Sequence, residues 1–224
     1  MIKLLFLHKS HKPYSFLWLF IIIACANFYC TKNNTLKFQN GDLLFQDLDS
    51  SPLCDAIEKV TNSIDDLNFS HVGIITLINK KEYVLEAFVN GVDTIPLKQF
   101  LKRSLNQDNE PKVIVGRLKE EFSSYIPKAI ENGFELIGKE YDEEFKINND
   151  KFYCSELIYE IFLNSNNNSL FELQPMTYKH DDKIIDIWVE YFNKLGIPVP
   201  ESEPGINPGG ISLSNKINII HKFY

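Results

Sequence analysis

The amino-acid sequence predicts an α+β fold that forms a single domain. Apolar runs of strand length fill the middle of the 224-residue chain, and apolar residues at helical spacing lie on either side of them. Strands and helices are therefore largely segregated along the chain, a pattern typical of α+β proteins. About 200 residues remain once the N-terminal segment is set aside, and a chain of that size buries a core without disulfide bonds.

Strands are predicted where apolar residues run almost without interruption. Residues 71–77 are nearly all apolar, which is typical of a buried strand, and Asn90-Gly91 predicts a turn between two later strands. Residues 217–220 fit an edge strand. The predicted strands are residues 41–45, 71–77, 83–88, 92–95, 113–118 and 217–220.

Helices are predicted from helical spacing of apolar residues and from the residues that begin and end them. Ser51 and Pro52 suit an N-cap and the first helical position, and Gly138 and Gly196 end two other helices. The proline- and glycine-rich residues 198–210 predict an irregular crossing. The predicted helices are residues 51–64, 126–137, 154–163 and 184–195, with another beginning near Pro96.

The charge distribution argues against a nucleic-acid partner. The chain carries a formal charge of −7, and residues 25–224 hold 20 Lys+Arg against 30 Asp+Glu, a charge of −10. No dense basic stripe is present to contact phosphates. No glycine-rich phosphate loop or haem motif stands out either, so no cofactor is expected.

Residues 1–24 have the three-part pattern of an export signal. A lysine-containing start leads into an apolar run, residues 14–23, and the small Ala24 precedes Cys25. The run is shorter than the roughly 20 apolar residues of a transmembrane helix. The end of the run resembles a bacterial lipobox, which makes Cys25 the expected lipidation site; a plain signal peptide or an uncleaved anchor is the alternative. The expected organisation is an export signal (1–24), a linker (25–40) and one domain (41–224), either anchored at the periplasmic face of a bacterial envelope or secreted.

If the protein is exported, the cysteine count leaves one thiol without a disulfide partner. With Cys25 lipidated, Cys30, Cys54 and Cys154 remain, an odd number for an oxidising compartment. Cys30 and Cys54 could pair and leave Cys154 free. The alternative is that Cys154 is itself the inert disulfide partner.

Cys154 stands at the start of a predicted helix, in Phe152-Tyr153-Cys154-Ser155. Unsatisfied N–H groups and the positive end of the helix dipole favour a thiolate there, and the thiolate is the nucleophilic form of cysteine. A cysteine in the first turn can also be a small core residue. Because residues 157–161 already supply the apolar face of this helix, we favour a nucleophile.

His71 is the candidate base, and Glu86 is a candidate partner for it. His71 lies where a polar lead-in meets a buried strand, whereas His180 sits in a charged, solvated stretch and His221 lies near the C-terminus. A histidine and a cysteine held together form a pair suited to acyl transfer. Glu86 lies between apolar residues of the next strand, and the sequence leaves open whether it faces solvent or accepts a hydrogen bond from the imidazole.

These residues carry a resemblance to a known family. In this order, the motifs resemble those of the YiiX/YebB-type permuted papain-like amidases, which belong to the circularly permuted NlpC/P60 superfamily. The histidine precedes the cysteine here, as the permutation implies. The motifs are Gly41-Asp42-Leu43-Leu44-Phe45, Ser70-His71-Val72-Gly73-Ile74, Val84-Leu85-Glu86-Ala87, Gly91-Val92 with Pro96-Leu97, Tyr141-Asp142 with Phe145, and Tyr153-Cys154-Ser155-Glu156-Leu157.

The resemblance implies a fold, an activity and a set of roles. The fold is a circularly permuted papain-like (NlpC/P60) α+β fold, with a small antiparallel sheet packed against the helix that carries the cysteine. The implied activity is hydrolysis of an amide bond, of peptide or peptidoglycan type, by a cysteine nucleophile that forms an acyl-enzyme. Cys154 is implied as nucleophile, His71 as general base and Glu86 as the residue that orients it, while Tyr141 and Glu156 occupy family-typical positions near the substrate.

Three alternatives stay open at this point. Export points to envelope substrates, and an acylated lipid competes with a peptide, because related permuted folds include lipid acyltransferases. A non-catalytic envelope lipoprotein is the second alternative. The third is a metal site made from His71, Glu86 and Cys154, which ranks low because zinc sites usually have closer ligand spacing or more ligands.

Overall fold

The computed structural model describes residues 36–163 and 169–224. Residues from Lys37 to Tyr224 form one compact unit, which begins ahead of the expected domain start at Gly41. The predicted export signal, Cys25 and Cys30 lie outside the described residues. No helix in the described ranges has the length and apolar character to cross a bilayer.

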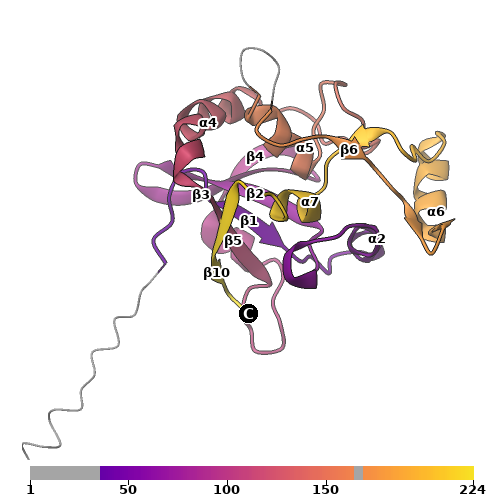
Figure 1. The fold of residues 1–224 in the computed structure, drawn as a ribbon, viewed down its shortest axis with the longest axis horizontal. Helices are drawn as coiled ribbons and strands as arrows, with labels where there is room; N and C mark the ends of the chain where they lie inside the picture. Colours follow the sequence, from indigo (N-terminus) through magenta and orange to yellow (C-terminus); the bar gives the residue numbers. More distant parts are fainter. Residues whose placement is uncertain (1–35, 164–168) are drawn as a thin grey trace, which may run out of the picture. The chain divides into compact units, whose positions relative to one another are not determined.

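A six-stranded antiparallel sheet forms the centre of this unit (Figure 1). Its strands lie in the order β10-β5-β1-β2-β3-β4, so β1 pairs with both β2 and the distant β5. Each strand predicted from an apolar run is present, and the expected antiparallel sheet is confirmed. The strands are β1 (Leu43–Gln46), β2 (His71–Ile78), β3 (Lys81–Phe88), β4 (Gly91–Pro96), β5 (Val113–Leu118) and β10 (Ile217–Lys222).

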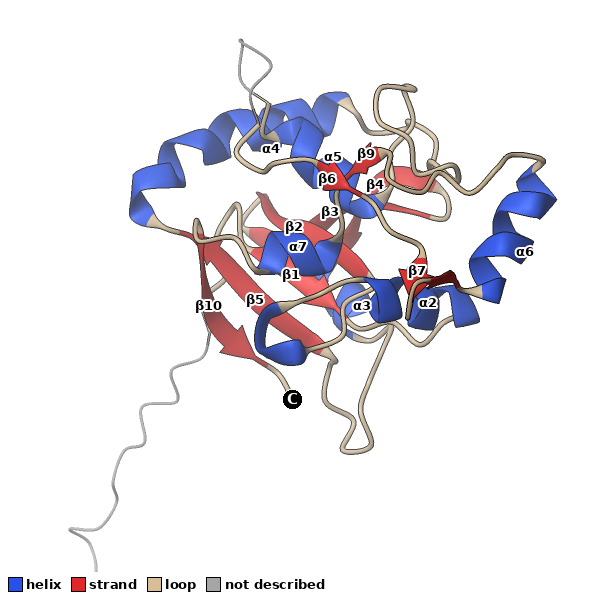
Figure 2. Ribbon diagram, turned by 45° about the vertical axis from the view of Figure 1, so that its right-hand side comes forward, coloured by secondary structure: helices blue, strands red, loops and turns tan. Residues whose placement is uncertain are grey.

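Some helices pack against the sheet, and others lie outside its edge (Figure 2). Helix α5 lies against β2 and β3, and α4 packs on α5. The apolar face predicted for α5 is confirmed, because Leu157 and Ile158 are fully buried with Ile74 and Leu85 of the sheet. The helices are α2 (Pro52–Val60), α3 (Leu97–Leu101), α4 (Ile126–Glu135), α5 (Cys154–Ile161), α6 (Asp186–Leu195) and α7 (Pro208–Ser212), with 3-10 turns η1 (Ile64–Asp66) and η2 (Glu120–Tyr125).

The C-terminal third differs from the prediction at one helix. The sequence predicts an irregular crossing through residue 210, but α7 begins at Pro208. Asn207 explains the difference, because its side-chain oxygen accepts the Gly210 N–H at 2.7 Å and caps the helix, while Pro208 suits the first helical position. Two short strand pairs complete the unit: β6 (Gln174–Pro175) with β9 (Pro204–Gly205), and β7 (Lys179–His180) with β8 (Lys183–Ile184).

Candidate active site

Cys154 is the first residue of α5 and is 5% exposed. The chain around it is held by hydrogen bonds on both sides. The Tyr153 N–H donates to Glu156 Oε2 at 3.3 Å, and Ser155 Oγ donates to the Ile206 carbonyl at 2.8 Å. The first of these bonds closes the N-terminal turn of the helix onto the residue before it. The thiol therefore occupies a fixed position at the positive end of the helix dipole.

His71 is the first residue of β2, and the pairing of β2 with β3 brings Glu86 to it. His71 Nε2 lies 2.7 Å from Glu86 Oε2, and both residues are almost fully buried. The alternative in which Glu86 faces solvent is therefore wrong. The imidazole also packs against Phe88 and Phe100, with ring centroids 5.2 Å and 5.8 Å away.

The structure places Cys154 beside His71, close enough for the thiol to affect the pKa of the imidazole. Because Glu86 occupies Nε2, Nδ1 is the ring nitrogen left for the sulfur. Burial by itself lowers the pKa of His71, but the hydrogen bonds to Cys154 and Glu86 outweigh it and raise that pKa to about 9. The imidazole therefore carries a proton at neutral pH and can donate it.

Gly73 lies on β2 where the side chain of Val84 on β3 approaches closely. A Cβ at this position would lie 2.5 Å from Val84 Cγ1 and 3.4 Å from Glu86 Cβ. A side chain there would clash with Val84 and force either that side chain or β2 to move. The glycine two residues after His71 is thus explained by close approach of neighbouring side chains.

Arg103 is a member of the site that the sequence did not reveal. It follows α3 and holds both carboxylate oxygens of Glu86: Nη1 donates to Oε2 at 2.7 Å, and Nη2 donates to Oε1. Its guanidinium also stacks 4.1 Å from the centroid of the Phe88 ring. In the sequence, Lys102-Arg103 reads as an ordinary basic pair after a helix, with no signal that one member is turned inward.

The cation on one side and the imidazolium on the other decide the charge of Glu86. Burial raises the pKa of a carboxyl group, but the hydrogen bonds and charges of His71 and Arg103 lower the pKa of Glu86 below its ordinary value. Glu86 therefore remains a carboxylate throughout the neutral range. It can hold the imidazole in one orientation and stabilise its positive charge.

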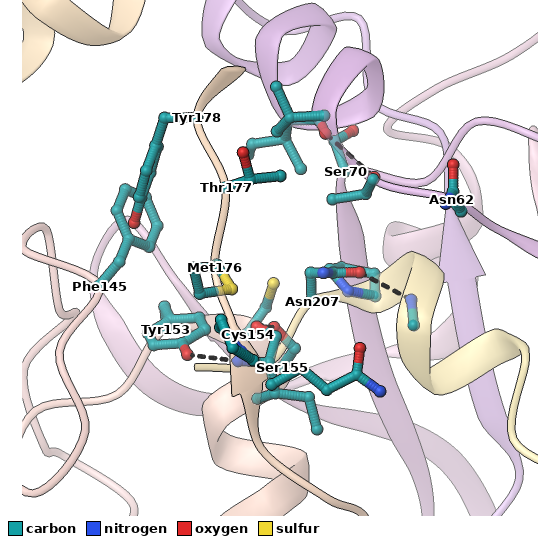
Figure 3. Close-up of a pocket in the computed structure, with 18 of the residues that line it drawn as sticks. Asn62, Ser70, Phe145, Tyr153, Cys154, Ser155, Met176, Thr177, Tyr178 and Asn207 are labelled. Carbon is teal, nitrogen blue, oxygen red and sulfur yellow. Dashed lines mark hydrogen bonds between the residues drawn. The ribbon is translucent and has the colours of Figure 1, made fainter. Parts of the chain in front are cut away.

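A pocket of about 240 Å³ opens beside Cys154. Figure 3 shows the sulfur of Cys154 directed into it from the base, beside Met176, with Phe145 and Tyr178 on one side and Ser70 on the other. Residues 206–208, from the segment leading into α7, also line it. The C-terminal segment, which the motifs barely cover, therefore contributes directly to the site.

The two other residues that the resemblance implicated have different positions. Tyr141 lines the pocket, and burial, together with the nearby Cys154, raises the pKa of its hydroxyl. Glu156 is not among the pocket-lining residues and accepts the Tyr153 N–H instead. Burial and the neighbouring Asp142 raise the pKa of Glu156 to about 9. A protonated Glu156 adds no negative charge near the thiol.

Comparisons with known proteins identify the family of this chain. The family model described as "Permuted papain-like amidase enzyme, YaeF/YiiX, C92 family" matches residues 37–220. The chain is 26% identical over 185 residues to the uncharacterized protein YiiX of Escherichia coli (strain K12). The alignment covers 82% of this chain and 86% of that protein.

A solved structure shares the fold. The crystal structure of metalloprotein yiiX from Escherichia coli O157:H7 superposes with a TM-score of 0.68 at 26% identity, covering 84% of this chain and 98% of that one. The permuted papain-like fold predicted from the sequence is confirmed, and so is the resemblance. The protein is a cysteine peptidase-like hydrolase, and it belongs to the YaeF/YiiX (C92) family of permuted papain-like amidase enzymes.

Proposed function

We propose that this chain hydrolyses an amide bond through Cys154, His71 and Glu86, with a covalent acyl-enzyme intermediate. The observation that carries the proposal is the buried chain of contacts from Cys154 through His71 and Glu86 to Arg103, next to a pocket. Each residue orients the next one: Arg103 binds the Glu86 carboxylate, and that carboxylate binds the His71 imidazole. The imidazole in turn lies beside the Cys154 sulfur.

The reaction has two halves. The Cys154 thiolate attacks the amide carbonyl carbon, and the resulting oxyanion accepts hydrogen bonds from backbone N–H groups at the start of α5, that of Cys154 among them. His71 gives its proton to the leaving amine as the C–N bond breaks. A water molecule then loses a proton to His71 and attacks the thioester, which releases a carboxylic acid and restores the thiolate.

The supporting residues have distinct roles in this proposal. Arg103 is a positioning residue that acts through Glu86. Tyr141, whose hydroxyl is kept protonated beside Cys154, binds the substrate as a hydrogen-bond donor. Glu156 holds the N-terminal turn of α5, so it positions the nucleophile from behind.

A metal is not part of this mechanism. The related crystal structure is described as that of a metalloprotein. Across residues 36–163 and 169–224, no group of three or more His, Cys, Asp and Glu side chains is arranged to hold a metal ion. Both oxygens of Glu86 are already bound by Arg103 and His71. The described residues therefore do not fit a metal site.

The hydrolase is proposed to act in the bacterial envelope. The sequence of residues 1–24 supports export, and Ala24-Cys25 supports lipidation at Cys25. The substrate is then an envelope molecule with an amide bond. When cells expressing the protein are fed labelled palmitate, we expect Cys25→Ala to lose the label and to move from the membrane to the soluble fraction. Cys30→Ala serves as the control and should retain the label; equal labelling of both variants would contradict the anchor.

Alkylation tests the reactive thiol and the activity together. With iodoacetamide at neutral pH, Cys154 should react at least tenfold faster than Cys54, because only Cys154 is paired with an imidazolium. Both thiols are buried, 5% and 7% exposed, so Cys54 is a matched control. Mass-spectrometric mapping measures labelling, and hydrolysis of a p-nitroanilide panel measures activity. The panel activity should fall in proportion to the fraction of Cys154 modified; activity that survives complete modification of Cys154 would exclude this mechanism.

A further inference from the structure

The segment that leads into α7 is tied to both neighbours of the nucleophile. The Ile206 N–H donates to Tyr153 Oη at 3.1 Å, and the Ile206 carbonyl accepts from Ser155 Oγ at 2.8 Å. The residues before and after Cys154 therefore both hold Ile206. The next residue, Asn207, lines the same pocket as Cys154 (Figure 3). Its position relative to the nucleophile is thus fixed by two hydrogen bonds from the start of α5.

The side-chain amide of Asn207 has a fixed orientation and an accessible donor. Its oxygen accepts the Gly210 N–H at 2.7 Å, which leaves the amide nitrogen on the side away from that N–H. Within the described part of the chain this is the one hydrogen bond of the side chain, and Nδ2 is not among the atoms buried without a partner. Asn207 is also only half-buried. Its Nδ2 can therefore donate a hydrogen bond to a bound molecule.

A second cavity, of about 270 Å³, adjoins the first along the same segment. The two cavities share five lining residues: Gln174, Ile206, Asn207, Gly210 and Leu213. Each cavity alone, at about 240 and 270 Å³, is smaller than the roughly 300–1,000 Å³ of typical ligand sites, whereas the two together fall within that range. A substrate that is attacked at Cys154 and is too long for the first cavity would extend past Asn207 into the second.

We propose that the two cavities form one substrate cleft, and that Asn207 binds the substrate where it passes from one cavity to the other. Nδ2 donates a hydrogen bond to a carbonyl oxygen of an extended, peptide-like chain. A peptide presents such an acceptor at every residue, whereas a hydrocarbon chain presents none. The proposal deepens the proposed function and rests on it, since the chain belongs to the same molecule whose amide bond Cys154 attacks. The preferred substrate is therefore a peptide of several residues.

Binding to a Cys154→Ala protein tests the cleft without turnover. In isothermal titration calorimetry, N-acetyl-Ala-Ala-Phe-Ala-Ala amide should bind at least about tenfold more tightly than N-acetyl-phenylalanine amide. Adding Asn215→Trp, which places a large side chain at the second cavity, should remove this gain. Adding Asn68→Trp, an exposed change outside both cavities, should preserve it. Equal affinity for the two ligands, or a gain that survives Asn215→Trp, would overturn the shared cleft.

Asn207→Ser separates the proposed donor from the cap of α7. Serine can still accept the Gly210 N–H as an N-cap, but it lacks the amide nitrogen. In the Cys154→Ala background, it should weaken binding of the five-residue peptide about 3- to 10-fold, the value of one neutral hydrogen bond, with an unchanged unfolding temperature. Asn207→Asp also keeps the cap but turns an acceptor toward the substrate carbonyl, so it should weaken binding further. Full affinity in either variant would overturn the assignment of Asn207.

The cleft and the hydrolase assignment can fail separately. If the peptide binds in this pattern but protein with an intact Cys154 hydrolyses none of the p-nitroanilides, the catalytic proposal is wrong and the cleft is supported. If hydrolysis depends on Cys154 but affinity does not rise with peptide length, the cleft is wrong and the catalytic proposal is supported.

Discussion

A Cys154→Ala protein should lose hydrolytic activity by a factor on the order of 10⁴ or more while keeping its fold. The sulfur is the atom that forms the proposed acyl-enzyme, and no neighbouring group can take over that bond. Alanine suits the first turn of a helix, and Leu157, Ile158 and Ile161 remain as the larger buried side chains of α5, so α5 should stay in place. The measurement is kcat/KM on the best p-nitroanilide, together with far-UV circular dichroism and thermal unfolding.

Cys54 supplies the control for this substitution. It is also a buried cysteine in the first turn of a helix, but its sulfur contacts Ser50 Oγ at 3.4 Å and Ser51 Oγ at 3.6 Å, and not an imidazole. Cys54→Ala should retain full activity with at most a small loss of stability. If Cys154→Ala keeps more than a few per cent of wild-type activity, the nucleophile is wrongly assigned, whatever Cys54→Ala does.

The parts of the site that the sequence predicted are those with a local signal. Cys154 stands where an apolar helical face begins, and His71 stands where a buried strand begins, so each position could be recognised from its own neighbourhood. Glu86 was ambiguous, because strand alternation gives the face of a side chain but not what covers that face. The β2–β3 pairing settled the question by placing the carboxylate against the imidazole.

The parts that were missed depend on contacts between distant segments. Arg103 meets Glu86 only because the chain turns back after α3, and nothing in Lys102-Arg103 indicates which member points inward. The aromatic contact between Phe145 and Trp188 has the same origin, because it joins the loop that precedes α5 to the distant helix α6. A folded site thus contains catalytic atoms that motifs can indicate and supporting contacts that only the tertiary structure supplies.

A Glu86→Gln protein should show the second large effect, in both rate and pH dependence. The alkaline limb of kcat/KM in the wild type should fall as pH rises through about 9, because the His71 imidazolium that protonates the leaving group is lost there. Glutamine keeps the shape of Glu86 but removes the charge that helps to raise the pKa of His71. The limb should therefore move below 9, and the rate at neutral pH should fall about 10²- to 10⁴-fold, as when the carboxylate of a catalytic triad is neutralised.

The free energy of unfolding should decrease in Glu86→Gln, as the pKa of His71 does. The pKa of His71 is raised in the folded state above its ordinary value of 6.5, so its contribution to stability is complete below that pH and is lost as pH rises through about 9. In Glu86→Gln this contribution shrinks, and Arg103 is left without its counter-charge, at a cost of up to about 3 kcal/mol. Urea unfolding at pH 6 and pH 10 measures both effects. Glu82→Gln, an exposed change on the same strand, should alter neither the limb nor the unfolding midpoint. An unmoved alkaline limb in Glu86→Gln would mean that Glu86 is a structural residue that does not set the proton affinity of His71.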